Sequence, residues 1–313
     1  MFDHRKMLMA VACLLIAEHA SMAADTPASQ PFSNTVETAY PGLATGVLSF
    51  AVLAELPAET LVACGKMRLV KTHLAAEIEK VPPDMRDSLA RNAFFMVEQM
   101  AAPKLLLAAA QKETPAPATR PAGVTDEQII NAHLEKVVQQ VKVSDDEVKE
   151  FYEQNKDMCG GAALDQIKDQ LMQYVLQQKK QETAIAYIRD LGKHLPLQVS
   201  RTWTEQQAVL ARDNPVDKAR MSGKPTMVDF GSTGCRPCEM MAPFLDTLEI
   251  KYEGKANILF IHVREDQVLA ARYGVRGIPL QVFFDAKGTE VFRHTGFYPQ
   301  AEIEKRLENL GVK

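Results

Sequence analysis

Two cysteines separated by two residues lie where a short apolar run ends and a helical stretch begins. Cys235 and Cys238 follow the run 226–230 and precede the stretch that begins at Glu239. The start of a helix carries partial positive charge, which stabilises a thiolate, and the thiolate is the form of cysteine that attacks disulfides. This placement predicts reversible thiol–disulfide exchange, with the Cys235–Cys238 disulfide as the redox centre and no other cofactor.

Around this motif, strands and helices alternate. We expect helices at 216–221, 236–252, 267–273 and 300–310, and strands at 226–230, 257–263, 280–285 and 290–295. The order β-α-β-α-β-β-α, preceded by a short helix, predicts an α/β sandwich around a mixed sheet. We therefore predict a C-terminal domain at residues 214–313.

Two stretches of this domain closely resemble thioredoxin. They are residues 228–243, which contain the Cys-Arg-Pro-Cys motif, and residues 273–280, which read Tyr-Gly-Val-Arg-Gly-Ile-Pro-Leu. A Cys-x-x-Cys pair alone is weak support, but here several separate elements agree in order and spacing over roughly the last third of the chain. The resemblance implies a thioredoxin fold for this domain.

The chemistry of the motif suggests a role for each of its members. We expect Cys235 to be the exposed nucleophile and Cys238, one helical turn further in, to be the buried resolving thiol. Arg236 adds positive charge beside the nucleophile, and Pro237 stiffens the loop. In thioredoxins the aspartate that matches Asp229 exchanges a proton with the resolving thiol, and burial raises the pKa of such a carboxyl. Cys235, Cys238 and Asp229 are the predicted catalytic residues.

The resemblance also implies a substrate groove. Ile278-Pro279 matches a cis-proline loop that faces the disulfide and pairs with an extended substrate chain, and Gly296 matches a glycine that lines the same groove. Gly234 stands where thioredoxins usually have a tryptophan, and Arg236 stands where they have a glycine. These departures predict a groove that is more open and more positive.

The cysteines and one histidine also have other interpretations. A structural zinc site needs two further ligands, and the sequence has no second Cys-x-x-Cys or Cys/His pair, so we expect no metal. A structural disulfide that closes a four-residue loop contributes little stability. Cys64 and Cys159 either bridge each other, remain free or are incidental, and we favour the free or incidental state. Strand alternation places His262 on the face where it could approach Asp229, although an ordinary core or surface histidine is the favoured alternative.

The first two-thirds of the chain has a different pattern. Residues 24–43 are rich in Ser, Thr, Ala and Pro and predict a flexible leader. Residues 44–195 predict a mostly helical domain, with capping boxes at Thr125 and Ser144 and a helix broken or kinked at Pro103. Within it, a short extended segment is predicted at 61–70, with a turn at 64–66. Residues 196–213 predict a connecting helix or linker.

Parts of the helical region resemble the N-terminal chaperone domain of SurA-type foldases and PrsA-type lipoproteins. The similar segments are residues 143–155, the long helix after Gly160-Gly161, and the turn and helix at 65–80. The resemblance implies a domain that holds unfolded clients. The parvulin portion of those foldases is absent from this sequence, so we predict no parvulin-type prolyl isomerase activity.

The first residues have the pattern of a secretory signal. A basic start at Arg5 and Lys6 precedes the apolar run 7–17, and small residues then favour cleavage after Ala23 or Ala24. The run is too short to span a bilayer. The net charge of −4 gives no electrostatic reason to expect nucleic acid or an anionic membrane as partner. We expect export to the periplasm or secretion, without stable membrane insertion.

Together these patterns predict an exported thiol–disulfide oxidoreductase, either a reductase or an isomerase. Its helical domain would engage protein clients that carry disulfides or unfolded segments, and an external, membrane-bound donor would supply electrons. The alternatives are a periplasmic chaperone with secondary redox activity and a dedicated reductase for one partner such as apocytochrome.

Overall fold

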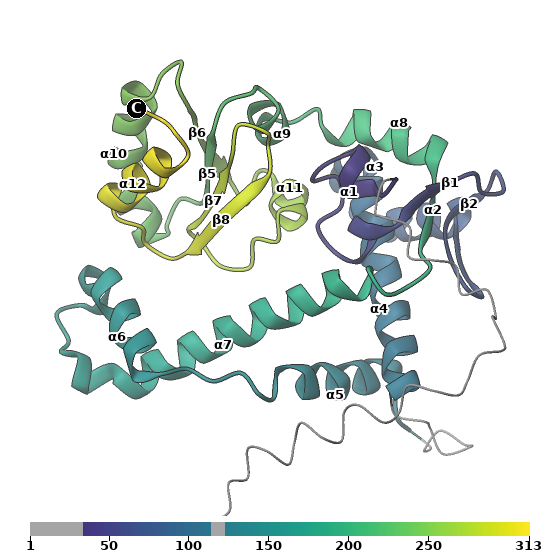
Figure 1. The fold of residues 1–313 in the computed structure, drawn as a ribbon, viewed down its shortest axis with the longest axis horizontal. Helices are drawn as coiled ribbons and strands as arrows, with labels where there is room; N and C mark the ends of the chain where they lie inside the picture. Colours follow the sequence, from purple (N-terminus) through teal and green to yellow (C-terminus); the bar gives the residue numbers. More distant parts are fainter. Residues whose placement is uncertain (1–33, 114–122) are drawn as a thin grey trace, which may run out of the picture. The chain divides into compact units, whose positions relative to one another are not determined.

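The computed structural model describes residues 34–113 and 123–313. The predicted signal peptide at 1–23 and the first part of the predicted leader lie outside the described residues. Figure 1 shows a C-terminal α/β domain and an N-terminal region rich in helix, as predicted.

The C-terminal domain contains one four-stranded sheet. Its elements are α9 (Pro215–Arg220), β5 (Thr226–Gly231), α10 (Arg236–Lys251), β6 (Asn257–His262), α11 (Gln267–Arg272), β7 (Leu280–Phe284), β8 (Glu290–Thr295) and α12 (Gln300–Asn309). The strand order is β6-β5-β7-β8; β5 pairs parallel with β6 and antiparallel with β7, and β7 pairs antiparallel with β8. The predicted elements and the mixed sheet are confirmed.

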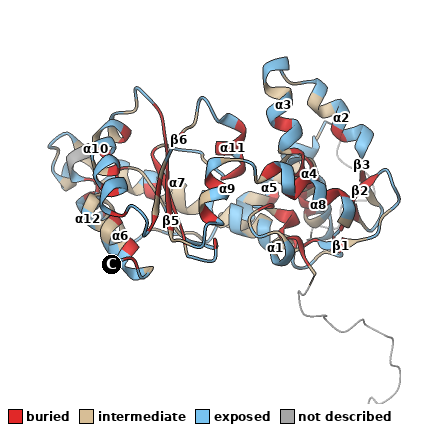
Figure 2. Ribbon diagram, turned by 90° about the horizontal axis from the view of Figure 1, so that it is seen from above, coloured by how far each residue is buried: buried red, intermediate tan, exposed pale blue. Residues whose placement is uncertain are grey.

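Helices cover both faces of this sheet, and Figure 2 shows the buried strand β5 between them. Alternate residues of β5 enter different cores. Met227 packs with residues of α10 and α12, whereas Val228 and Phe230 pack with residues of α9 and α11. All six residues of β5 are buried. A charged residue such as Asp229 is unusual in a strand that is covered on both faces.

The N-terminal region is mostly helical but also contains a second sheet, in which the extended segment predicted at 61–70 is confirmed as a hairpin. The strands are β1 (Val52–Ala54), β2 (Thr60–Cys64), β3 (Met67–Val70) and β4 (Gln198–Ser200), in the order β1-β4-β2-β3. The helices of its core are α1 (Val36–Ala39), η1 (Val47–Phe50), α2 (Lys71–Glu79), α4 (Ala93–Glu113) and α8 (Arg201–Ala211). Helix α3 (Pro83–Arg91) packs beside α2, α4 and α8. The strands have three to five residues, too short for an alternating pattern to distinguish them from buried helix.

Two segments predicted to lie outside the domains, as a flexible leader and as a connecting helix or linker, belong to this core. Thr35 pairs with Val52 in an isolated bridge, so the end of the predicted leader is ordered. The predicted linker contains β4, which pairs with β1 and β2, and α8, whose Trp203 stacks on Phe94 of α4 with 5.5 Å between ring centroids. The flexible leader predicted up to residue 43 is wrong from residue 34 on, whereas the helix predicted within 196–213 is confirmed as α8. Contacts with residues far away in the sequence hold both segments in this core.

Three further helices carry few buried side chains. They are α5 (Asp126–Val138), α6 (Asp145–Gln154) and α7 (Leu164–Leu191), with the short η2 (Lys156–Cys159) between the last two. We call α5, α6, η2 and α7 the helical arm. The capping boxes at Thr125 and Ser144 are confirmed. Within α7 only Val175 is buried, so most of this long helix lies outside the hydrophobic cores.

Helix α4 differs from its prediction, because it continues through Pro103. It is also the one helix within the described ranges that is long and apolar enough to cross a membrane, judged by length and composition alone. Its Phe94, Val97 and Ala101 are fully buried in the core of the N-terminal region. This packing accounts for its apolar composition.

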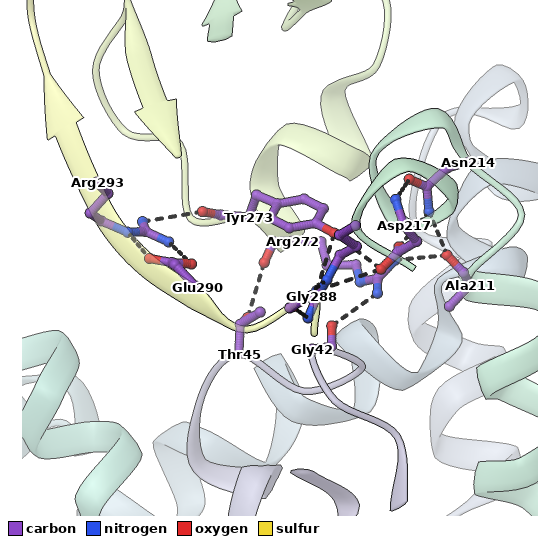
Figure 3. Close-up of polar contacts among 11 residues, drawn as sticks. Gly42, Thr45, Ala211, Asn214, Asp217, Arg272, Tyr273, Gly288, Glu290 and Arg293 are labelled. Atoms are coloured by element: carbon purple, nitrogen blue, oxygen red, sulfur yellow. Dashed lines mark hydrogen bonds and ion pairs between the residues drawn. The ribbon is translucent and has the colours of Figure 1, made fainter. Parts of the chain in front are cut away.

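A buried polar network surrounds Arg272, at the end of α11 (Figure 3). The Arg272 guanidinium donates to the Asp217 carboxylate at 2.7 Å and to the carbonyl oxygens of Ala211 and Gly42 at 2.7 and 3.0 Å. The Thr45 hydroxyl donates to the Arg272 carbonyl oxygen at 3.0 Å. Because these contacts join α8, α9 and α11 to the segment 42–45, they attach the two regions to each other.

Candidate active site

The two motif cysteines form a disulfide at the start of α10. The Cα atoms of Cys235 and Cys238 are 5.3 Å apart. Cys235 is the N-cap residue of the helix and is half-buried, whereas Cys238 is only 4% exposed. The Cys238 N–H points at the Cys235 sulfur, at a distance of 3.4 Å. An accessible sulfur at a helix start and a covered sulfur behind it suit the nucleophilic and resolving roles.

The structure around the disulfide accounts for glycine at position 234 and changes the expected effect of arginine at position 236. Gly234 has φ of +76°, a left-handed conformation that favours glycine over tryptophan. Its N–H donates to Oε1 of Glu239 at 3.1 Å. Glu239 therefore places a carboxylate beside the same turn as the exposed Arg236, and its charge offsets the positive environment predicted from Arg236 alone. Glu239 was not predicted as a site residue, although an acidic residue in the first turn of a helix was a visible signal.

Asp229 is fully buried in β5. The Gln281 side-chain amide of β7 donates to its Oδ1 at 2.8 Å, while its Oδ2 has no hydrogen-bond partner within the described part of the chain. Burial raises the pKa of Asp229 to about 6, and the hydrogen bond from Gln281 opposes this effect only in part. The carboxyl can therefore exchange a proton near neutral pH.

Glycine at position 231 brings this carboxyl and the resolving cysteine to one place. An ideal Cβ built on Gly231 would lie 3.3 Å from Sγ of Cys238 and 3.4 Å from Oδ2 of Asp229. The unpartnered oxygen and the covered sulfur therefore border the same small space. The structure brings together the three predicted catalytic residues.

His262 does not approach Asp229. The backbone N–H of Thr233 donates to its Nε2 at 3.2 Å, and its Nδ1 lies 3.6 Å from a Glu265 carboxylate oxygen. The residue opposite Asp229 in the parallel register is instead Phe260. His262 thus supports the loop that leads to the cysteines, in line with the alternative interpretation as an ordinary histidine.

The predicted groove residues come together at the start of β7 and the end of β8. The Ile278–Pro279 peptide bond is cis, and the Gly296 N–H donates to the Pro279 carbonyl oxygen at 2.8 Å. Gly296 has φ of +109°, which favours glycine. Away from the site, Cys64 and Cys159 are free cysteines and do not bridge each other.

Comparison with known proteins matches the C-terminal domain. The model of a thioredoxin-like domain family matches residues 213–311. Thioredoxins from Staphylococcus aureus strains Mu50 / ATCC 700699 and MW2 are each 42% identical to this chain over 82 residues, which are 26% of this chain and 78% of the relative. Among solved structures, a mutant thioredoxin from Halobacterium salinarum NRC-1 is 31% identical, with a TM-score of 0.29, and the match covers 31% of this chain and 83% of that one.

The sequence relatives confirm the resemblance stated for the C-terminal domain. The family match does not extend into residues 34–212. The resemblance of the helical region to the chaperone domain of SurA-type foldases therefore stays a prediction.

Proposed function

Because the chain belongs to the thioredoxin family through its C-terminal domain, we propose that it is an exported thiol–disulfide oxidoreductase that acts on protein disulfides. One observation carries the proposal. The accessible Cys235 is the N-cap of helix α10, and the covered Cys238 borders the oxygen of Asp229 that has no partner among the described residues. This is the arrangement that a nucleophile, a resolving thiol and a base require.

The exchange proceeds in two steps from the dithiol form. In the first, the Cys235 thiolate attacks one sulfur of a client disulfide, a Cys235–client bond forms, and the other client sulfur leaves as a thiolate. In the second, the Cys238 thiol gives its proton to the Asp229 carboxylate, and the Cys238 thiolate attacks the Cys235 sulfur. The Cys235–Cys238 bond forms, the client sulfur leaves, and two electrons have moved to the client.

The loop at Ile278-Pro279 is the proposed binding site for the client chain. An extended client segment would pair with this loop beside Gly296, so that recognition would depend on backbone and not on one sequence. A thioredoxin-like reductase then needs an external electron donor, for which we propose a membrane-bound protein. An isomerase instead returns to the dithiol form when a client thiol displaces Cys235.

The catalytic proposal is tested by Cys235→Ser, with Cys64→Ser as the matched control at a free, half-buried cysteine. The measurement is the reduction of insulin disulfides with dithiothreitol as the electron source. We expect Cys235→Ser to lower the catalysed rate by roughly a thousandfold, and Cys64→Ser to leave it unchanged. Equal rates in the wild type and Cys235→Ser would contradict the proposal.

We also propose that the helical arm binds unfolded segments of clients. Tyr174 and Ile185 of α7 are 46% and 37% exposed, which gives the arm apolar side chains outside the cores. The test is suppression of aggregation of a cysteine-free client by the full chain carrying Cys235→Ser and Cys238→Ser. Adding Tyr174→Ser and Ile185→Ser should weaken suppression, whereas Val209→Ser and Leu210→Ser, at exposed positions of α8, should not. Loss of suppression in both pairs, or in neither, would count against the arm.

A dedicated reductase for one partner is distinguished by trapping. Cys238→Ala stalls the reaction at the mixed disulfide, so every client stays bound to Cys235. Many different trapped proteins would support general action, and a single trapped protein would support a dedicated reductase.

A further inference from the structure

Phe260 is an aromatic residue of β6, the edge strand of the C-terminal sheet. It lies opposite Asp229 in the parallel register of β5 and β6, so both side chains leave the sheet on the face covered by α10. Its side chain is 49% exposed. Part of the ring therefore faces solvent, while the other part faces the interior beside the active site.

The inner edge of this ring fills the space that a side chain at position 231 would occupy. An ideal Cβ on Gly231 would lie 2.7 Å from Cε2 of Phe260, closer than real Cβ contacts allow. Sγ of Cys238 and Oδ2 of Asp229 border the same point at 3.3 and 3.4 Å. We call the place where this Cβ would lie the Gly231 gap. The ring edge, the sulfur and the carboxylate oxygen surround it.

The polarity of the Gly231 gap depends on the groups that border it. On α10 the facing titratable group is Cys238, and on β7 the facing group is the neutral amide of Gln281. On β6 the next residue on the same face is His262, whose Nε2 accepts from the Thr233 N–H and whose Nδ1 faces Glu265. Within the described residues, Oδ2 of Asp229 is buried without a partner. Access of water past Phe260 would therefore change the solvation of this oxygen directly.

We propose that Phe260 is a positioning residue that closes the Gly231 gap to solvent and thereby controls proton transfer from Cys238 to Asp229. This inference rests on the proposed function. The apolar ring of Phe260 excludes water from the space between the acid and the base, which keeps the carboxyl a stronger base than it would be in water.

Gly231 and Phe260 act together in this arrangement. A larger residue at position 231 would push the ring out of the gap, and a smaller residue at position 260 would admit water. The half-exposed ring is supplied from the neighbouring strand, and its contact with His262, at 6.3 Å between ring centroids in an edge-to-face arrangement, limits its movement along β6.

The experiment measures the second exchange step as a function of pH in the full chain. The reduced protein is mixed rapidly with an aromatic disulfide, 5,5′-dithiobis(2-nitrobenzoate), and the second equivalent of released thiolate reports the attack of Cys238 on the mixed disulfide. The variants are Phe260→Ala, the conservative Phe260→Leu, and Val291→Ala. Val291 is a matched control because it lies on the other edge strand and is 47% exposed.

In the wild type we expect the rate of the second step to rise through the pKa of Asp229 and then level off. Phe260→Ala should move this rise to lower pH by about one unit, because water lowers the pKa of the carboxyl, and should lower the plateau roughly threefold, because the base is weaker. Phe260→Leu should keep the wild-type profile, since leucine still covers the gap. Val291→Ala should also keep it.

A Phe260→Ala profile that rises at the wild-type pH would overturn the inference, even if its plateau were lower, because loss of packing alone does not move the rise. An equal movement in Val291→Ala would overturn it too. Absence in the wild type of any second release that depends on Cys238 would instead contradict the proposed function, which keeps the two failures distinguishable.

Discussion

One buried carboxylate in each region of the molecule shows how differently such groups can be hydrogen-bonded. In the N-terminal region, Glu98 of α4 accepts three backbone N–H groups of the segment 45–48, at 2.9 to 3.1 Å. In the C-terminal domain, Asp229 accepts one hydrogen bond, from Gln281, and its second oxygen is unpartnered within the described residues. Burial raises the pKa of both carboxyls. A carboxylate with its partners holds a loop in place, whereas one without them is available for proton transfer.

Asp217 shows that the difference follows the role and not the region. It also belongs to the C-terminal domain, yet it receives hydrogen bonds from Arg272 at 2.7 Å and from the Tyr273 hydroxyl at 3.1 Å. The Arg220 guanidinium lies 3.6 Å from Oδ1 of Asp217, the oxygen that accepts from Tyr273. The number of partners therefore separates the structural carboxylates from the one proposed to act in chemistry.

The strongest challenge to this comparison is removal of the partner of Asp217. We expect Arg272→Ala to lower the free energy of unfolding by about 3–5 kcal/mol, because it leaves a buried carboxylate without its main partner. Urea denaturation followed by Trp203 fluorescence measures the change. Arg276→Ala, at an exposed arginine nearby, should change stability little. A similar small loss for both would show that Arg272 is not needed to compensate Asp217.

The Glu98 site should lose stability without losing chemistry. Glu98→Ala leaves three backbone N–H groups unpaired, so we expect a loss of about 3 kcal/mol in the free energy of unfolding. Glu98→Gln keeps one acceptor oxygen and should lose less. Exchange at Cys235 should be unchanged in the folded protein. Glu135→Ala, at an exposed position of α5, is the control for stability. Slower exchange in folded Glu98→Ala would contradict a purely structural role for Glu98.

Replacing Asp229 should raise stability, whereas replacing Glu98 should lower it. The pKa of Asp229 is about 6 in the folded protein and near 4 when unfolded, so the folded state binds the proton more tightly. The corresponding stability is fully present below about pH 4 and is lost as the pH rises through 6. Asp229→Asn removes this loss, and we expect the disulfide form to gain up to about 3 kcal/mol at pH 8 and little at pH 4.

The same substitution should slow the attack of Cys238 roughly tenfold or more at pH 7, because asparagine cannot accept the proton. Stability is measured by urea denaturation at the two pH values, and the attack by release of the second thiolate. A gain of stability together with slower exchange would support a role of Asp229 in proton transfer, in contrast to the structural role of Glu98. Destabilisation at pH 8 would show that Asp229 is a structural carboxylate after all.

The C-terminal domain was predicted in detail, whereas only the hairpin of β2 and β3 was predicted in the N-terminal sheet, as an extended segment at 61–70. The strands and helices of the C-terminal domain are bounded by local signals, and its motif residues are close in sequence. The N-terminal sheet instead joins residues 52–54 to residues 198–200. Strands of three residues leave almost no local pattern, and pairing over such a separation is not visible in hydrophobic periodicity. This is why the ordered parts of the predicted leader and linker were unexpected.

The residues alone determined the chemistry of this chain, since a helix start next to a cysteine pair and a charged residue within an apolar strand are local features. Only the tertiary structure decided how that chemistry is enclosed. Phe260 covers the Gly231 gap from another strand, and Arg272 compensates Asp217 from another helix. These contacts depend on the packing of segments that are distant in the chain, and packing sets both the solvation of a carboxyl and the number of its partners.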